Sequence, residues 1–396
     1  MDWKPWLRRW SEEWISTAEE DDELDEAVLR DRWLGFGSAT EDEVARAEAR
    51  LGFRLPPSYR DFLLTTNGWR RAGMFVFRMR DTETVDWLRH HEPYWEEWEE
   101  LCEDDNPDPD PGNSNRFSRG LLLSLEADAG ILFLDPLDVD EKPEWAAYSL
   151  FSWRAEPPVK FASFAELMED LYAEFHRMRR PAGPTRDHWD AAVERARLDA
   201  LAGNTGAAEE TLKRAEDFGR ERATVLRAQL LILAGREYKA RSLLRRLLHE
   251  SFSARRFPDR PGVHRGVRAL PVRRPPAYRG TPPLVGVAGG DDRRTAWDHE
   301  DGRRTRAAVL GEGLSYGNAE FDERIRRART EHEHDPEALW AAIRAALPHW
   351  RPRTPDHLAP VVLLADPVLA AAVTRERGRE LLATARAGLA GATDPD

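Results

Sequence analysis

Cysteine is almost absent from this sequence, which holds a single one, Cys102, in 396 residues. One cysteine cannot form an internal disulfide or a cysteine-rich zinc site, and this excludes a small secreted fold held together by disulfides. The residues around Cys102 are mostly acidic, and negative charge disfavours the thiolate that a nucleophilic cysteine requires. We therefore expect Cys102 to have a structural or incidental role.

Long apolar runs are also missing. No stretch of about 20 residues is apolar enough to span a bilayer. The N-terminal sequence MDWKPWLRRWSEEW lacks the apolar centre of a signal peptide. These absences predict a cytoplasmic protein with no membrane partner. The length of the chain allows two or three domains of about 100–200 residues each.

Motifs of known catalytic chemistry are scarce. The sequence has no phosphate-binding loop and no His-Glu-x-x-His, and its one Gly-x-Ser-x-Gly stands at residues 313–317. His90 and His91 are neighbours, but adjacent positions on a helix point about 100° apart and do not easily share a metal ion. We expect no catalytic residue, no metal site and no cofactor, and an uncharacterised enzyme is the remotest of the alternatives.

Charge is distributed unevenly along the chain. Residues 1–180 hold 22 Lys and Arg against 41 Asp and Glu, which gives a net charge of −19. Because the whole chain carries −13, residues 181–396 carry +6. The acidic part should attract basic proteins and repel nucleic acid.

The first 70 residues carry signals for three helices. A stripe of apolar residues at three- and four-residue spacing predicts an amphipathic helix within residues 1–15 that packs on its domain. Thr40 and Glu43 form a capping box, and Gly52 suits the C-cap of the helix that this box begins. A further helix should start near the proline pair at 56–57, because proline is tolerated in a first helical turn.

The next hundred residues predict strands as well as helices. Since the strands do not alternate regularly with helices, the pattern favours an α+β domain. The expected elements are a strand at 73–79, a helix at 83–103, a loop at 104–115, a hairpin of 120–126 with 130–135, a strand at 145–153 and a helix from Ser163 to about Arg179.

Read together, residues 33–69 resemble the signature of the SUKH superfamily, named for its Smi- and Knr-type cell-wall regulators. That signature is an acidic capped helix, Glu-x-x-Leu-Gly, Leu-Pro-x-x-Tyr-x-x-Phe-Leu and Asn-Gly. Later features of the family are an Asp-Pro at 135–136, the Glu-Trp at 144–145 and the Ser-Phe-x-x-Leu-Met at 163–168. The resemblance covers about residues 30–180. The residues that carry it best are Glu48, Leu51, Gly52, Leu55, Pro56, Tyr59, Phe62, Leu63, Asn67, Gly68, Trp145 and Phe164.

The resemblance implies an α+β fold with a mixed sheet and flanking helices. It also implies protein binding, because bacterial members resemble immunity proteins that neutralise toxins, often nucleases, while eukaryotic members act as regulatory scaffolds. We expect the signature residues to determine the fold rather than to contact a partner. Acidic residues beside large aromatics suit contact with a basic protein. The candidate contact residues are Trp95, Glu96, Trp98, Glu99, Glu100, Asp104, Asp105, Asp108 and Asp110.

The second half of the chain is predicted to be helical after a linker at 181–186. Four residues recur with a shift of 32, so that Ala196, Gly203, Ala208 and Leu212 match Ala228, Gly235, Ala240 and Leu244. Small residues at this spacing predict paired helices, and residues 187–250 resemble tetratricopeptide helical hairpins, which recur about every 34 residues. An all-α, tetratricopeptide-like extension is thus expected to follow the first domain, which spans 1–180.

Residues 251–317 are rich in Arg, Pro and Gly and predict an extended connector. Aromatic residues are sparse there, so that its arginines do not suggest nucleic-acid binding. Residues 318–396 return to a helical pattern. Two functions therefore lead: an immunity-type protein that neutralises a toxin, which could be a basic nuclease, or a regulatory adaptor that uses the helical extension.

Overall fold

The computed structural model describes residues 1–19, 22, 24–104, 115–139, 143–253 and 314–386. It divides into two compact units. The first comprises Met1–Asp187 with Asp217–Gly219, and the second comprises His188–Glu216 with Arg220–Asp396. Most of the predicted connector lies outside the described residues. Each unit is described by itself below.

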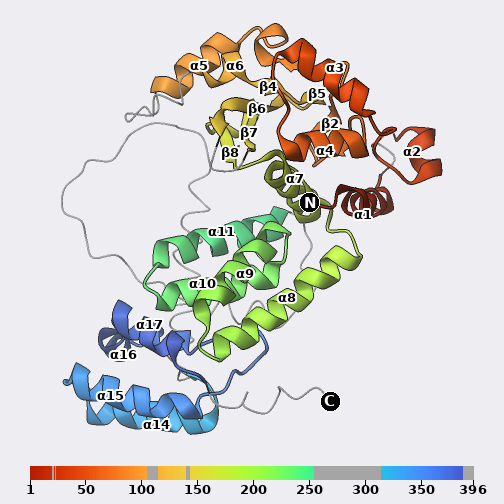
Figure 1. Ribbon diagram of the computed structural model, residues 1–396. Helices are drawn as coiled ribbons and strands as arrows, with labels where there is room; N and C mark the ends of the chain where they lie inside the picture. The colour runs from red at the N-terminus through yellow and green to blue at the C-terminus, as the bar shows by residue number, and fades with distance from the viewer. Residues whose placement is uncertain (20–21, 23, 105–114, 140–142, 254–313, 387–396) are drawn as a thin grey trace. The chain divides into compact units, whose positions relative to one another are not determined.

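The first unit begins with four helices, drawn in red to orange in Figure 1. The apolar stripe of the first helix is buried, as predicted from its spacing. Thr40 and Glu43 form the predicted capping box, and Gly52 takes the left-handed conformation with φ +76°. The helices are α1 (Trp3–Ser16), α2 (Glu26–Asp31), α3 (Glu41–Leu51) and α4 (Pro57–Thr65).

Among the described residues that follow, eight strands form two sheets, one of three strands in the order β1-β2-β5 and one of five strands in the order β3-β4-β6-β7-β8. Every strand pair in the described chain is antiparallel. The strands are β1 (Arg70–Ala72), β2 (Val76–Met79), β3 (Asp86–Trp87), β4 (Leu121–Leu122), β5 (Ser124–Ala127), β6 (Gly130–Val139), β7 (Trp145–Phe151) and β8 (Val159–Phe161). The α+β class is confirmed, and where a mixed sheet was expected there are two antiparallel ones.

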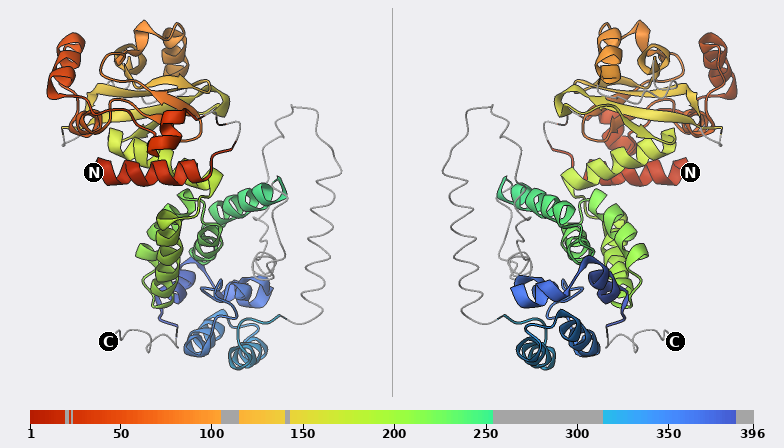
Figure 2. Two further views of the ribbon diagram at one scale, coloured as in Figure 1. Left: turned by 90° about the vertical axis from the view of Figure 1, so that its right-hand side faces the viewer. Right: turned by 90° about the vertical axis from the view of Figure 1, so that its left-hand side faces the viewer.

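The five-stranded sheet is covered on both faces (Figure 2). On β6, Leu132 and Leu134 point into a core shared with α1, α4 and α7 (Phe164–Arg179). Their neighbours Ile131 and Phe133 point into a smaller core beneath α5 (Trp95–Asp104) and α6 (Arg116–Arg119). A strand buried on both faces has few polar positions, which explains why GILFL is a continuous apolar run.

Two elements differ from the sequence prediction. The expected helix at 83–103 is instead strand β3, a 3-10 turn η2 (Leu88–His90) and then α5. Pro93 separates the two parts, because proline is poorly tolerated within a helix. The expected strand at 120–126 is split: β4 pairs with β6, whereas β5 joins β2 in the other sheet. A 3-10 turn η3 (Ser152–Arg154) ends β7.

The predicted repeat of the second unit corresponds to two helical hairpins. Gly203 and Gly235 both have positive φ, at +99° and +74°. In each turn the next N–H donates to a carbonyl five residues back, from Asn204 to Asp199 and from Arg236 to Leu231. This is the Schellman geometry that ends helices. The helices are α8 (Pro184–Leu201), α9 (Thr205–Asp217), α10 (Glu221–Leu233) and α11 (Glu237–Ser253). The packed pairs are therefore confirmed, whereas their tetratricopeptide character stays a prediction.

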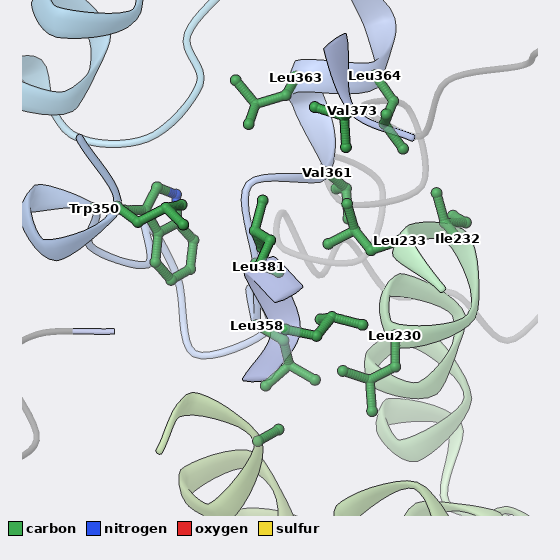
Figure 3. Packing of buried hydrophobic residues seen from close by; sticks show 14 of the residues in the cluster. Leu230, Ile232, Leu233, Trp350, Leu358, Val361, Leu363, Leu364, Val373 and Leu381 are labelled. Carbon is green, nitrogen blue, oxygen red and sulfur yellow. The ribbon is translucent and has the colours of Figure 1, made fainter. Parts of the chain in front are cut away.

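Residues 314–386, the other described part of the second unit, are also largely helical. Its core gathers leucine and valine side chains from α10 and from the C-terminal helices, with Trp350 on one side (Figure 3). Gln229 ties α10 to the later chain, since its side chain accepts a hydrogen bond from the Leu358 N–H and donates one to the Asp356 carbonyl. The elements are α14 (Ala319–Glu331), α15 (Pro336–Ala346), η4 (Leu347–His349), η5 (Val361–Ala365), α16 (Pro367–Ala372) and α17 (Arg375–Ala383).

Candidate protein-binding surface

Helix α5 lies over the five-stranded sheet and holds most of the predicted contact residues that the structure describes. Its two tryptophans are half-buried and pack on the core beneath the helix. The ring of Trp98 lies 5.8 Å from that of Phe117 on α6, measured between centroids. Trp95 and Trp98 therefore fasten α5 to the domain. An aromatic ring held in this way offers only its outer edge to a partner.

Glu99 is buried at 8% exposure and faces the same way as the tryptophans. Its carboxylate accepts hydrogen bonds from the backbone N–H groups of Arg116 at 2.8 Å and Phe117 at 2.9 Å. These are the unpaired donors of the first turn of α6, so Glu99 stabilises the start of that helix. Burial raises the pKa of Glu99, although the hydrogen bonds from the backbone oppose the rise. Glu99 has a structural role, and we remove it from the predicted contact set.

The outer face of α5 carries three exposed carboxylates, those of Glu96, Glu97 and Glu100. The side chain of Tyr94, just before the helix, is 57% exposed. No ion pair is found for these glutamates within the part of the chain that the structure describes. The face thus combines unneutralised negative charge with an exposed aromatic ring. Glu97 and Tyr94 were absent from the sequence prediction.

The acidic stretch continues beyond this face. Asp104 is the last residue of α5, and its side chain is outside the described part of the structure. Asp105, Asp108 and Asp110 also lie outside the described residues. Their predicted part in contact with a partner stays a prediction.

The signature residues have roles within the fold. The carboxylate of Glu48 accepts a hydrogen bond from the Leu55 N–H at 3.0 Å, which fixes the turn between α3 and α4. The side-chain oxygen of Asn67 accepts a hydrogen bond from the Thr82 N–H at 2.8 Å, and the side-chain nitrogen of Asn67 donates one to the Thr82 hydroxyl at 3.1 Å. Gly68 has φ +100° and lies against the Met79 carbonyl, which favours glycine there.

The apolar signature residues lie in the larger core of the first unit, beneath α1, α4 and α7. Six of them are buried there, at 6% exposure or less. Trp145, the first residue of β7, keeps 7% exposure. The six are Leu51, Leu55, Tyr59, Phe62, Leu63 and Phe164. Pro56 precedes α4 as its N-cap, with φ −64°.

Two acidic residues of the later signature complete the frame. Asp135 is buried and forms two hydrogen bonds of 2.7 Å with the Arg119 guanidinium. Glu144 accepts from both the N–H and the hydroxyl of Ser58, at 3.0 and 2.6 Å, in the first turn of α4. Such bidentate contacts fix the spacing of elements that are far apart in sequence.

Residues 38–170 match the model of the SMI1 / KNR4 family (SUKH-1). This segment belongs to that family. The SUKH match starts just before α3 and ends within α7, so that it includes both sheets and the helices α3 to α6, but not α1 or α2. No curated protein and no solved structure matches the chain.

Ionisable groups converge at a second place in the SUKH domain. The Asp86 carboxylate lies 3.1 Å from His90 Nδ1 and 3.3 Å from His91 Nε2. Burial raises the pKa of Asp86, but the Trp87 N–H and His90 outweigh burial and lower it overall. Among the described residues, no group of three or more His, Cys, Asp or Glu is placed to hold a metal ion.

Hollows on the first unit are shallow. One of about 360 Å³ lies along α1 and residues 182–184, and one of about 430 Å³ lies beside Trp33 and Phe36.

None of the helices in the described ranges combines the length and the apolar character that a bilayer-spanning helix requires.

Proposed function

We propose that this protein is an immunity-type binder whose SUKH domain neutralises a toxin through the outer face of α5. The observation that carries the proposal is the set of exposed, unpaired carboxylates of Glu96, Glu97 and Glu100 beside the exposed ring of Tyr94. The family to which the domain belongs includes immunity proteins, which supports this class of function.

The chemistry of the face favours a basic partner. An aromatic residue can anchor an interface, and a rim of carboxylates accelerates the approach of a positively charged protein. A nuclease domain, whose surface must attract phosphates, has charge of the required sign. Because the carboxylates are exposed, salt should weaken the association by screening them.

The test starts by capturing the partner from native cells with the full chain and identifying it. The partner is then expressed alone to learn whether it arrests growth, and with the chain to learn whether the arrest is relieved. In a variant with Glu96→Lys, Glu97→Lys and Glu100→Lys, relief should be lost. The matched control reverses three other exposed acids of the first unit, Asp42→Lys, Glu83→Lys and Glu156→Lys, and should keep it.

Two results would count against the proposal. One is a partner that is harmless when expressed alone. The other is equal loss of relief in both variants, because that would trace the effect to total charge rather than to the α5 face.

An adaptor function is the alternative, and one observation favours it. Tyr238 on α11 is 88% exposed, the largest exposure among the exposed large apolar side chains of the described chain. Paired helices present extended binding surfaces. If the Tyr238→Ala variant no longer binds the captured partner while the α5 variant still does, the helical extension makes the contact. That result would favour the adaptor function.

A further inference from the structure

The hollow beside Trp33 and Phe36 is lined by two cations, Lys4 and Arg70, and one carboxylate, Asp31, in a domain that is acidic overall. It has a volume of about 430 Å³ and is lined by the end of α2, the segment from Trp33 to Ser38, Lys4 of α1 and Arg70 of β1. Both aromatic rings are half-buried. The larger acidic face described above lies on α5, which contributes no residue to this hollow.

Four cations lie over the two rings. Lys4 Nζ is 5.1 Å and the Arg8 guanidinium carbon 5.6 Å from the centroid of the Trp33 ring. Over Phe36, the guanidinium carbon of Arg70 lies 3.7 Å from the ring centroid and that of Arg78 lies 5.3 Å from it. Such cation–π contacts are attractive and help to hold the charged groups over the rings.

This positive charge is only partly neutralised. Asp25 pairs with Arg70 at 2.8 Å, and Asp31, which lines the hollow, pairs with Arg30 at 2.7 Å. Lys4, Arg8 and Arg78 have no ion-pair partner within the described ranges. Like charges repel one another, and the repulsion grows as they come closer. A bound oxyanion would relieve that repulsion.

We propose that this hollow binds the carboxylates of an acidic peptide segment from a protein partner. Guanidinium groups bind carboxylates through paired hydrogen bonds. The cations come from separate elements. Lys4 of α1 and Arg70 of β1 line the hollow, which is open to solvent. Arg8 of α1 and Arg78 of β2 do not line it but lie over the two rings that do. That spread suits a row of carboxylates better than one compact anion. The rings are already covered by cations, so the site does not require an aromatic ligand.

The inference goes beyond the proposed toxin binding. It concerns different elements and a partner of opposite charge, and it holds or fails whether or not α5 binds a toxin.

The experiment measures binding of a fluorescein-labelled hexaglutamate peptide to the full chain by fluorescence anisotropy. Binding should weaken as salt rises to about 150 mM, where the screening length is about 8 Å. The variant Arg8→Glu with Arg78→Glu should bind the peptide at least about tenfold more weakly, which corresponds to about 1.4 kcal/mol. Arg54→Glu changes an exposed arginine between α3 and α4 and should bind like the unaltered chain.

A second variant protects the test from loss of folding. Lys4→Gln with Arg8→Gln alters two exposed side chains on α1 and should also weaken peptide binding, with an unchanged melting temperature. A labelled hexalysine peptide serves as the probe of the α5 face, and its binding should be unaffected by both variants. If the unaltered chain binds hexaglutamate but not hexalysine, the result counts against the proposed function and leaves this inference standing.

Three results would overturn the inference. The first is the absence of hexaglutamate binding at low salt. The second is equal weakening by Arg54→Glu, which would make the effect one of net charge. The third is displacement of the peptide by an equal concentration of inorganic phosphate, which would identify a site for small anions instead.

Discussion

His176 Nε2 lies 2.9 Å from the Glu13 carboxylate, and both side chains are buried although 163 residues separate them. The Tyr172 hydroxyl donates to the same carboxylate oxygen. The other oxygen accepts from the Thr185 N–H at 3.2 Å. One carboxylate thereby joins α1, α7 and the start of α8 inside the first unit.

Glu13→Gln should destabilise the first unit at neutral pH. Burial raises the pKa of Glu13, but the hydrogen bonds from His176, Tyr172 and Thr185 outweigh burial and leave the pKa below its usual 4.5. The stabilisation is therefore complete above about pH 4.5 and is lost as the pH falls through the lower pKa of the folded state. We expect a loss of about 1–3 kcal/mol near pH 7.

Urea unfolding of the full chain between about pH 7 and pH 3 checks this prediction. The gap in unfolding free energy between the variant and the unaltered chain should narrow toward acid. A gap that is constant across the range would show that ionisation of Glu13 has no part in it.

Glu99→Ala should weaken the packing of α5 on α6. Alanine leaves the first backbone N–H groups of α6 without an acceptor, at a cost of about 1–3 kcal/mol. Glu99→Gln keeps an acceptor oxygen and avoids burying a charge, so it should cost less. The melting temperatures of the two variants rank them, and a larger loss for glutamine than for alanine would contradict the capping role.

Gly68→Ala should destabilise more than Gly52→Ala, although both residues have positive φ. An added Cβ at Gly68 would lie 3.2 Å from the Met79 carbonyl oxygen, whereas the space at Gly52 is open within 4 Å. Gly52→Ala should cost about 1 kcal/mol, from backbone strain alone. Thermal unfolding of both variants tests which one loses more stability. Equal losses would show that the Met79 carbonyl moves aside without cost.

Gly378→Ala should destabilise the second unit. An added Cβ on α17 would collide with the Leu233 carbonyl oxygen at the end of α10. Backbone is slow to move aside, so we expect a loss of about 2–3 kcal/mol. Gly206→Ala, where an added Cβ meets nothing within 4 Å, is the control and should leave stability unchanged or raise it by up to about 1 kcal/mol. Similar melting temperatures for the two variants would contradict the close approach of α17 and α10.

Local signals predicted the local structure. The capping box of Thr40 and Glu43, the prolines at the start of α4 and the repeated glycines at 203 and 235 each act within a few residues, and the structure contains the corresponding caps and turns. The region after Val85 was predicted poorly because its structure is set from far away. Asp86 and Trp87 pair with Leu122 and Leu121, and no pattern within 83–103 reveals that distant partner.

The acidic and aromatic composition of residues 95–104 predicted a contact surface on α5. The helix periodicity decides which of these residues face solvent. Trp95, Trp98 and Glu99 follow a spacing of three and four residues and share the buried side. Glu96, Glu97 and Glu100 occupy the opposite side. The same rule, applied to the sequence, would have separated Glu99 from its neighbours. The positive hollow had only a faint signal, the pair Lys4 and Arg8 on the outer side of a tryptophan stripe.

The packing of strand β6 determines how easily its backbone amides reach solvent. Successive side chains of β6 enter different cores, one beneath α5 and one beneath α7. If either helix moved away, the strand would be exposed on one face only. Its central amides, near Leu132 and Phe133, should exchange with deuterated solvent only when the whole unit opens.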